Sequence, residues 1–123
     1  MAENVLLEKA KDFAVEIVNL CRGIQSEQRE YVLTGQLLRC GTSIGANLHE
    51  ANYAQSRADF VSKIQIALKE SYETEYWLEL LSRTGFLSDE RYGTLRSACG
   101  TIRRMLIASI NTAKRKHNSS ETS

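Results

Sequence analysis

A line of polar side chains follows one edge of a helical segment and contains the residue types that could do chemistry. Arg39, Ser43, Asn47 and Glu50 are three or four residues apart, which places them on one face of a helix. Glu75 interrupts the apolar stripe of a later segment, where an unpaired buried charge would be strongly unfavourable. Arg39 is the nearest cation that could pair with it, and Ser43 or Asn47 could donate hydrogen bonds. We call these five residues the polar seam.

The polar seam does not match a catalytic or metal-binding pattern. A di-iron bundle needs Glu-x-x-His motifs on two helices, and the sequence contains none. His49 and Glu50 are adjacent, so on a helix they point about 100° apart and are poorly placed to share a metal ion. We therefore predict no enzymatic activity, no catalytic, metal or cofactor-binding residues, no cofactor and no small-molecule substrate.

Helical periodicity dominates the 123-residue chain, which has no proline and no alternating strand pattern. Apolar residues recur every three or four positions in four segments. They predict helices over about 4–24, from 27 or 30 to 53, over 56–83 and over 88–117. Short connections make neighbouring helices antiparallel. The sequence predicts an all-α, up-down-up-down four-helix bundle as one domain over residues 1–117, with 118–123 as a disordered polar tail.

Local signals mark the ends of these helices. Ser26 is placed to cap the second helix, and Ser56, with Asp59 three residues later, to cap the third. Gly85 suits the left-handed conformation that ends many helices. Ser88 precedes two acidic residues and is expected to begin the fourth helix.

Glycines and exposed aromatic residues indicate self-association. Gly41 and Gly45 lie inside the second predicted helix, where each glycine costs roughly 1 kcal/mol relative to alanine. The presence of glycine at both positions predicts a close packing contact, which we assign to a second copy of the chain. Tyr72 and Tyr76 lie one turn apart beside the apolar stripe of the third helix, as interface aromatics often do. We expect a homo-oligomer that uses these four residues.

Charge is unevenly distributed, although the net charge is only +1. Residues 1–86 contain nine lysines and arginines against twelve acids, whereas residues 87–123 contain seven against three. A basic helix can follow a phosphate backbone, and a solvated helix face is the structural alternative. The candidate nucleic-acid-binding residues are Arg91, Arg96, Arg103, Arg104, Lys114, Arg115 and Lys116.

The cellular compartment is inferred from what the sequence lacks. Cys21, Cys40 and Cys99 are far apart and match no zinc or disulfide pattern, so we expect small buried thiols in a reducing environment. No apolar run approaches the roughly 18 residues of a membrane span, and no signal peptide is evident. These features predict a cytoplasmic protein with no membrane contact.

Two stretches resemble the family of four-helix bundle proteins named after 23S rRNA intervening sequences: LLRCGTSIGANLHEA and DFVSKIQIALKESYETEYWLELL. The resemblance covers nearly the whole chain. The matching positions are Arg39, Ser43, Ile44, Asn47 and Glu50, then Phe60, Ala67, Leu68, Glu70, Glu75 and Leu78. Many members have glycine after the glutamate of the second helix, where this chain has Ala51.

The resemblance implies an antiparallel bundle that assembles as a homopentamer in the bacterial cytosol, with no known enzymatic activity. A more distant similarity is to the accessory proteins of diversity-generating retroelements, which bind nucleic acid and a reverse transcriptase. Those accessory proteins are strongly basic, whereas the isoelectric point of this chain is near 7.7.

Three hypotheses about function follow from these observations. The first is a non-enzymatic oligomer that binds RNA or a nucleoprotein through the basic fourth helix. The alternative is a protein-interaction scaffold without nucleic-acid binding, in which the basic residues aid solubility. The third is a ligand- or metal-binding bundle, which would need a polar cavity near Ser43, Asn47 and Glu75.

Overall fold

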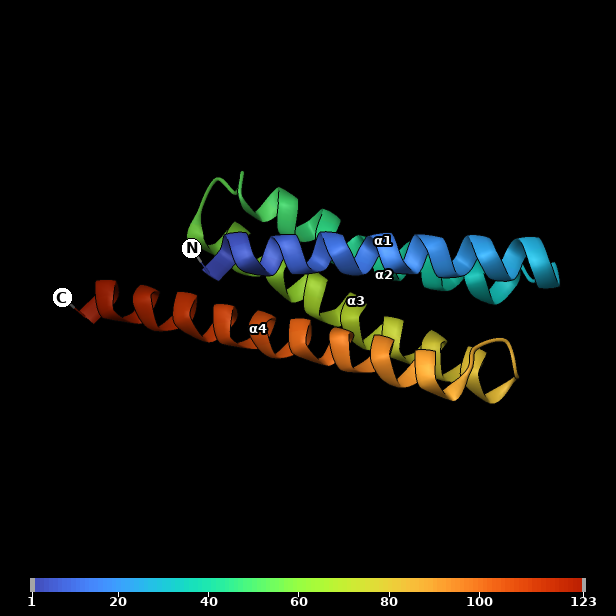
Figure 1. Ribbon diagram of the computed structural model, residues 1–123. Coiled ribbons are helices and arrows are strands. Elements are labelled where there is room, and N and C mark those ends of the chain that lie inside the picture. Colours follow the sequence, from blue (N-terminus) through green and yellow to red (C-terminus); the bar gives the residue numbers. More distant parts are fainter. Residues whose placement is uncertain (1, 123) are drawn as a thin grey trace.

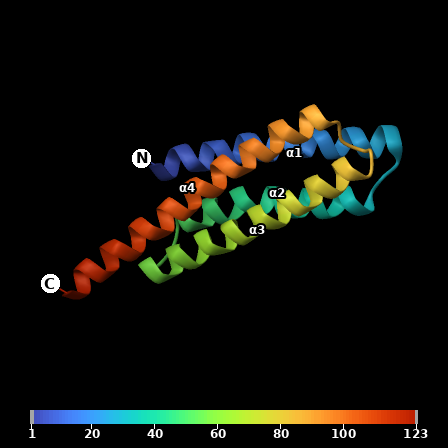
Figure 2. The ribbon, with the colours of Figure 1, turned by 90° about the horizontal axis from the view of Figure 1, so that it is seen from below.

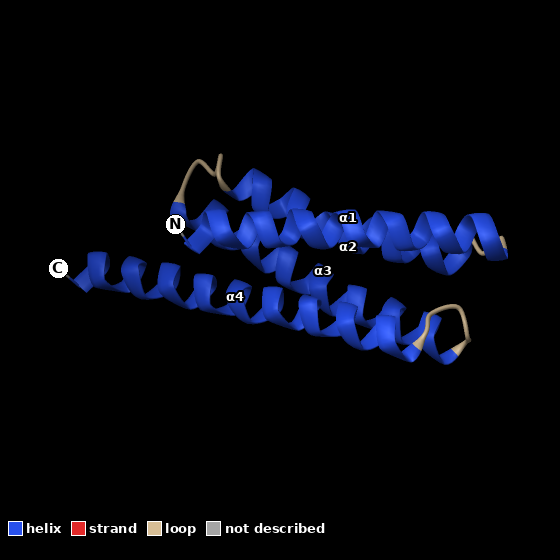
Figure 3. Ribbon diagram, in the orientation of Figure 1, coloured by secondary structure: helices blue, strands red, loops and turns tan. Residues whose placement is uncertain are grey.

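Four antiparallel helices make up the computed structural model, which describes the backbone of residues 2–122 and the side chains of residues 5–116. Helix α1 spans Ala2–Gln28, α2 spans Val32–Ala51, α3 spans Arg57–Arg83 and α4 spans Asp89–Thr122. Short turns join them, and the described chain contains no strand (Figures 1 and 3). The predicted up-down-up-down bundle is confirmed.

Each helix packs mainly against its neighbours in the chain. The contact between α2 and α3 is the most extensive, and that between α1 and α4 is the sparsest. Figure 2 shows α4 crossing α1 and then diverging from it toward the C-terminal end. The bundle is therefore more open along the α1–α4 edge than along the other three.

Apolar side chains from all four helices form one core. Among the most deeply buried are Phe13 of α1, Ile44 of α2, Leu78 of α3 and Leu106 of α4, each at most 2% exposed. They belong to the four apolar stripes, so periodicity alone identified the inward face of every helix.

The three cysteines are free thiols in this core, as predicted. Burial raises the pKa of Cys21 to about 11 and that of Cys99 to about 12, because a thiolate would lose its hydration in an apolar interior. Both groups are therefore neutral at physiological pH and act as small apolar side chains.

Two of the predicted helix ends are confirmed in detail. At the start of α3, the Ser56 Oγ accepts a hydrogen bond from the Asp59 N–H at 3.0 Å, and the Asp59 carboxylate accepts one from the Gln55 N–H at 3.2 Å. The first bond satisfies a backbone donor in the first turn of α3, and the second holds the residue just before the cap. Gly85, with φ of +86°, supplies the left-handed residue just after α3.

The cap of α2 differs from the prediction. Ser26 lies inside α1, which continues to Gln28, so its assignment as a cap was wrong. The Glu30 carboxylate instead accepts hydrogen bonds from the backbone N–H groups of Leu33 at 2.8 Å and Thr34 at 2.9 Å. Burial alone would raise the pKa of Glu30, but these bonds lower it overall. Their stabilisation is present at neutral pH and is lost as pH falls through the lowered pKa.

The two interior glycines of α2 pack against α1 of the same chain. A Cβ added to Gly41 would lie 3.0 Å from Ile17 Cγ2, and one added to Gly45 would lie 3.6 Å from the Ala10 carbonyl oxygen. Both glycines are buried. Their assignment to an interface with a second copy was therefore wrong, because α1 already occupies the space that they leave.

The C-terminal segment also departs from its prediction. Helix α4 continues to Thr122, so residues 118–122 are helical and the prediction of a disordered tail was wrong there. Polar composition alone does not end a helix, and no proline or glycine follows Gly100. Ser123 lies outside the described residues.

Candidate functional site

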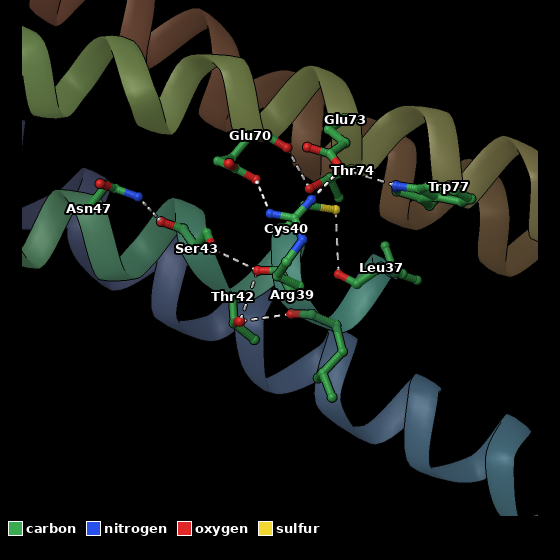
Figure 4. A network of polar contacts seen from close by, with 11 residues as sticks. Leu37, Arg39, Cys40, Thr42, Ser43, Asn47, Glu70, Glu73, Thr74 and Trp77 are labelled. Atoms are coloured by element: carbon green, nitrogen blue, oxygen red, sulfur yellow. Dashed lines mark hydrogen bonds and ion pairs between the residues drawn. The ribbon is translucent and has the colours of Figure 1, made fainter. Parts of the chain in front are cut away.

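The polar seam joins α2 to α3 through Arg39. The Arg39 guanidinium donates to Glu70 Oε2 at 3.3 Å and also pairs closely with Glu73, on successive turns of α3 (Figure 4). The hydrogen bond from Arg39 lowers the pKa of Glu73, and Trp77 Nε1 donates to the same carboxylate at 3.4 Å. One cation between two carboxylates gives this cluster a net negative charge.

The other members of the polar seam on α2 bond mostly to their own helix. Ser43 Oγ donates to the Arg39 carbonyl at 2.6 Å, and Asn47 Nδ2 donates to the Ser43 carbonyl at 2.8 Å (Figure 4). Glu50 crosses to α3, where it pairs with Lys63 at 3.2 Å. Since these groups are already satisfied, they leave no set of converging donors for a ligand.

Glu75 pairs with Arg103 of α4 rather than with Arg39. The two side chains are 24% and 23% exposed, and the Arg103 guanidinium also lies 5.4 Å from the ring centre of Tyr72. The expected Arg39–Glu75 pair was therefore wrong. Glu75 lies on the side of α3 that meets α4, whereas Glu70 and Glu73 lie on the side that meets α2.

The basic residues of α4 do not form a single patch. Arg96, Arg103 and Lys114 are seven and eleven residues apart, close to whole numbers of turns, so they share one line. Arg104 and Arg115 share a second line about 100° further round. Arg91 and Lys116 lie on the opposite flank of the helix from the first line, and Arg91 lines a hollow beside α1.

Of the seven candidate nucleic-acid-binding residues of α4, all except Arg103 are exposed. Among the described side chains, no carboxylate lies within 4.0 Å of Arg96, Arg104 or Lys114. Cations without carboxylate partners keep their full charge for an external anion. Arg39 on α2, by contrast, is bound by the carboxylates of Glu70 and Glu73.

The two tyrosines of α3 are exposed, as predicted. Tyr72 is 52% exposed and Tyr76 is 57% exposed. The ring of Tyr76 meets that of Trp77 edge-on, with centres 5.0 Å apart. On α4, Ile107 is 37% exposed and follows Arg103 by one turn. Because Arg103 lies against Tyr72, we infer that Tyr72, Tyr76 and Ile107 form one exposed apolar patch beside the Glu75–Arg103 pair.

The described residues contain neither a metal-ligand cluster nor a membrane-spanning helix. They contain no group of three histidine, cysteine, aspartate or glutamate side chains arranged to hold a metal ion. His49 instead lies 5.6 Å from the ring of Tyr53. Within the same residues, every helix is too short or too polar to span a membrane.

These contacts define an all-α bundle in which ion pairs join α3 to both α2 and α4. The chain belongs to the family of 23S rRNA-intervening sequence proteins, whose family model matches residues 2–108. A crystal structure from Bacteroides thetaiotaomicron is 51% identical, with a TM-score of 0.89 over 90% of this chain and 99% of that one. That structure is of a protein of unknown function from the S23 ribosomal protein family. No curated protein matches the chain.

Sequence reasoning missed the residues that complete the charge pairs. Glu70 and Glu73 are three residues apart on α3, which places them on one face, and this spacing could have identified them as partners of Arg39. Lys63 was also missed, because the sequence does not show that it lies opposite Glu50. Arg103 was identified only as a candidate contact to nucleic acid, because the sequence does not reveal which face of α4 meets Glu75.

Proposed function

We propose that this protein is a non-enzymatic, cytoplasmic homo-oligomer that binds RNA or a nucleoprotein through α4. The observation that carries the proposal is the set of exposed cations on α4 that have no carboxylate partner among the side chains of residues 5–116, chiefly Arg96, Arg104 and Lys114. Several copies of such a helix in one assembly multiply the positive field, although one chain has a net charge of only +1. Phosphate groups are the anions that such a surface attracts most strongly.

Replacing Arg96, Arg104 and Lys114 together by glutamine tests this role. We expect RNA affinity, measured by fluorescence anisotropy at low salt, to fall by tenfold or more, and the slope of log K against log salt to decrease by about three. The matched control removes three exposed cations elsewhere, through Arg22→Gln, Lys69→Gln and Arg83→Gln. It should change the affinity about twofold at most.

The proposal is abandoned if structured RNA is not retained at low salt, or if both triple variants bind equally well. A protein partner that stays bound after nuclease digestion, and that binds the α4 variant normally, would favour the interaction scaffold instead.

Self-association is proposed through the apolar patch of Tyr72, Tyr76 and Ile107. Half-exposed tyrosines beside an aliphatic side chain are typical of interface cores, where aromatic residues contribute much of the binding energy. The family resemblance puts the number of subunits at five. The variant Tyr72→Ser/Tyr76→Ser should sediment as a monomer at micromolar concentration.

Tyr53→Ser is the matched control, because Tyr53 is 75% exposed but lies in the turn after α2. It should leave the sedimentation coefficient of the oligomer unchanged. A wild-type protein that sediments as a monomer, or a double variant that stays assembled, would contradict the interface.

A further inference from the structure

The open edge between α1 and α4 contains two hollows, of about 220 and 250 Å³, and Glu16 lines both of them. We call the larger one the α1–α4 hollow. Phe13 and Ile102 are buried core residues that form its apolar floor. Its rim is polar, and the exposed carboxylates of Asp12 and Glu16 belong to it. The hollow therefore combines an apolar surface with hydrogen-bond acceptors.

The two carboxylates of the α1–α4 hollow are not paired within the described part of the chain. Among those side chains, no lysine, arginine or histidine nitrogen lies within 4.0 Å of Asp12 or Glu16. Lys9 also lines the hollow, so two negative charges face one positive charge. The rim thus favours a partner that brings cations or hydroxyl donors.

The apolar patch of Tyr72, Tyr76 and Ile107 offers the complementary chemistry. Both tyrosines are more than half exposed, and a phenol hydroxyl can donate a hydrogen bond to a carboxylate. Lys69 is an exposed cation one turn before Tyr72 on α3, and the Arg103 guanidinium lies against the Tyr72 ring. An aromatic patch beside cations matches a hollow with an apolar floor and an acidic rim.

The patch and the hollow also lie at the same height along the bundle. The Glu75–Arg103 pair shows which part of α4 is level with the tyrosines of α3, and Ile102, the residue before Arg103, lines the hollow. The patch is on the side of α4 that meets α3, and the hollow is on the side that meets α1. Copies related by rotation about one axis are not shifted along it, so surfaces that meet must be level.

We propose that copies of this chain associate head to tail, with the patch of Tyr72, Tyr76 and Ile107 of one copy seated in the α1–α4 hollow of the next. The Tyr76 ring covers the apolar floor, and its hydroxyl donates to a carboxylate of the rim. Because the two surfaces differ, the contact is heterologous, and its repetition closes a ring. Both surfaces flank α4, so this helix faces the axis of the ring. The inference rests on the self-association in the proposed function.

Reversing the charge of the rim tests the α1–α4 hollow. We expect Asp12→Arg/Glu16→Arg to sediment as a monomer of 13.9 kDa where the wild type is assembled, because the new arginines repel Lys69 and remove the acceptors. Glu8→Arg/Glu27→Arg is the matched control, since both acids are exposed on α1 and line neither hollow. It should assemble like the wild type. Circular dichroism verifies that both variants are folded.

A mixture of two monomeric variants distinguishes a head-to-tail contact from a symmetric one. Tyr72→Ser/Tyr76→Ser keeps the hollow intact, and Asp12→Arg/Glu16→Arg keeps the patch intact. Mixed at the highest soluble concentration, they should form a dimer with one 13.9-kDa chain of each kind and nothing larger, because only one contact can form. Native mass spectrometry measures this. If two patches met each other instead, the mixture would stay monomeric.

The outcomes separate this inference from the proposed function. If the Asp12→Arg/Glu16→Arg variant stays assembled, or if the mixture forms no dimer, the head-to-tail contact is refuted and the tyrosine interface still stands. If Tyr72→Ser/Tyr76→Ser stays assembled, the proposed interface fails, and the α1–α4 hollow loses its occupant with it.

Discussion

Replacing Gly41 by leucine should lower the free energy of unfolding by about 3 kcal/mol, because the interface between α1 and α2 has no space for a side chain there. The added Cβ alone would lie 3.0 Å from Ile17 Cγ2 and 3.2 Å from Ile17 Cγ1, and Ile17 is fully buried. The gain in helix propensity offsets less than about 1 kcal/mol of this loss. Urea unfolding followed by circular dichroism measures the difference.

Gly35 provides the control on the same helix. It is exposed, and a Cβ added to it would meet no atom within 4 Å. Gly35→Leu should therefore stabilise the protein by about 0.5 kcal/mol, through helix propensity alone. The opposite signs of the two changes test the packing directly. A Gly41→Leu protein that unfolds like the wild type but sediments as a smaller particle would restore the intersubunit role that the sequence indicated.

Replacing Glu75 by leucine should cost about 2 kcal/mol, because it leaves the Arg103 guanidinium without its carboxylate in a site that is largely shielded from water. The side chains of this pair are about one quarter exposed, so the loss is smaller than for a fully buried pair. Adding Arg103→Leu should recover more than half of the lost stability, since two apolar side chains then replace the pair. The same urea titration measures both variants.

Glu79→Leu is the matched control, one turn further along α3. Glu79 pairs with Arg83, but these side chains are 53% and 74% exposed, and the change should cost less than about 0.5 kcal/mol. A second comparison combines Glu75→Leu with Arg39→Leu. The two effects should add, because Arg39 pairs with Glu70 and Glu73. Strong coupling between Arg39 and Glu75 would show that the observed pairing is wrong.

Periodicity predicted the architecture because burial of an apolar stripe is the main requirement on each helix. The stripe of α2, for example, includes Leu37, Ile44 and Leu48, and all three are buried. Local hydrogen bonding was also predictable at Ser56, where the capping pattern depends on residues close in sequence. Helix ends without such a pattern were not predictable. The example is Ser26, which was wrongly assigned as the cap of α2.

The candidate site was less predictable because it depends on which helices face one another. Glycines at Gly41 and Gly45 indicate a close contact, but they do not identify the partner, and the partner is α1 of the same chain. An acidic residue in an apolar stripe indicates a pair, yet Glu75 could reach cations on either neighbouring helix. Rotation of α3 by part of a turn decides between Arg39 and Arg103, and nothing in the pattern of α3 alone sets that rotation.

Because the bundle has an even number of antiparallel helices, the chain finishes at the same end of the bundle at which it begins. We call the two ends of the bundle its poles. The beginning of α1 and the end of α4 accordingly lie at the same pole, together with the connection from α2 to α3, and the two other turns lie at the opposite pole (Figure 1). Copies arranged side by side about a single axis would therefore form a particle with two unlike sides, only one of which carries the C-terminal part of α4 with Lys114 and Arg115.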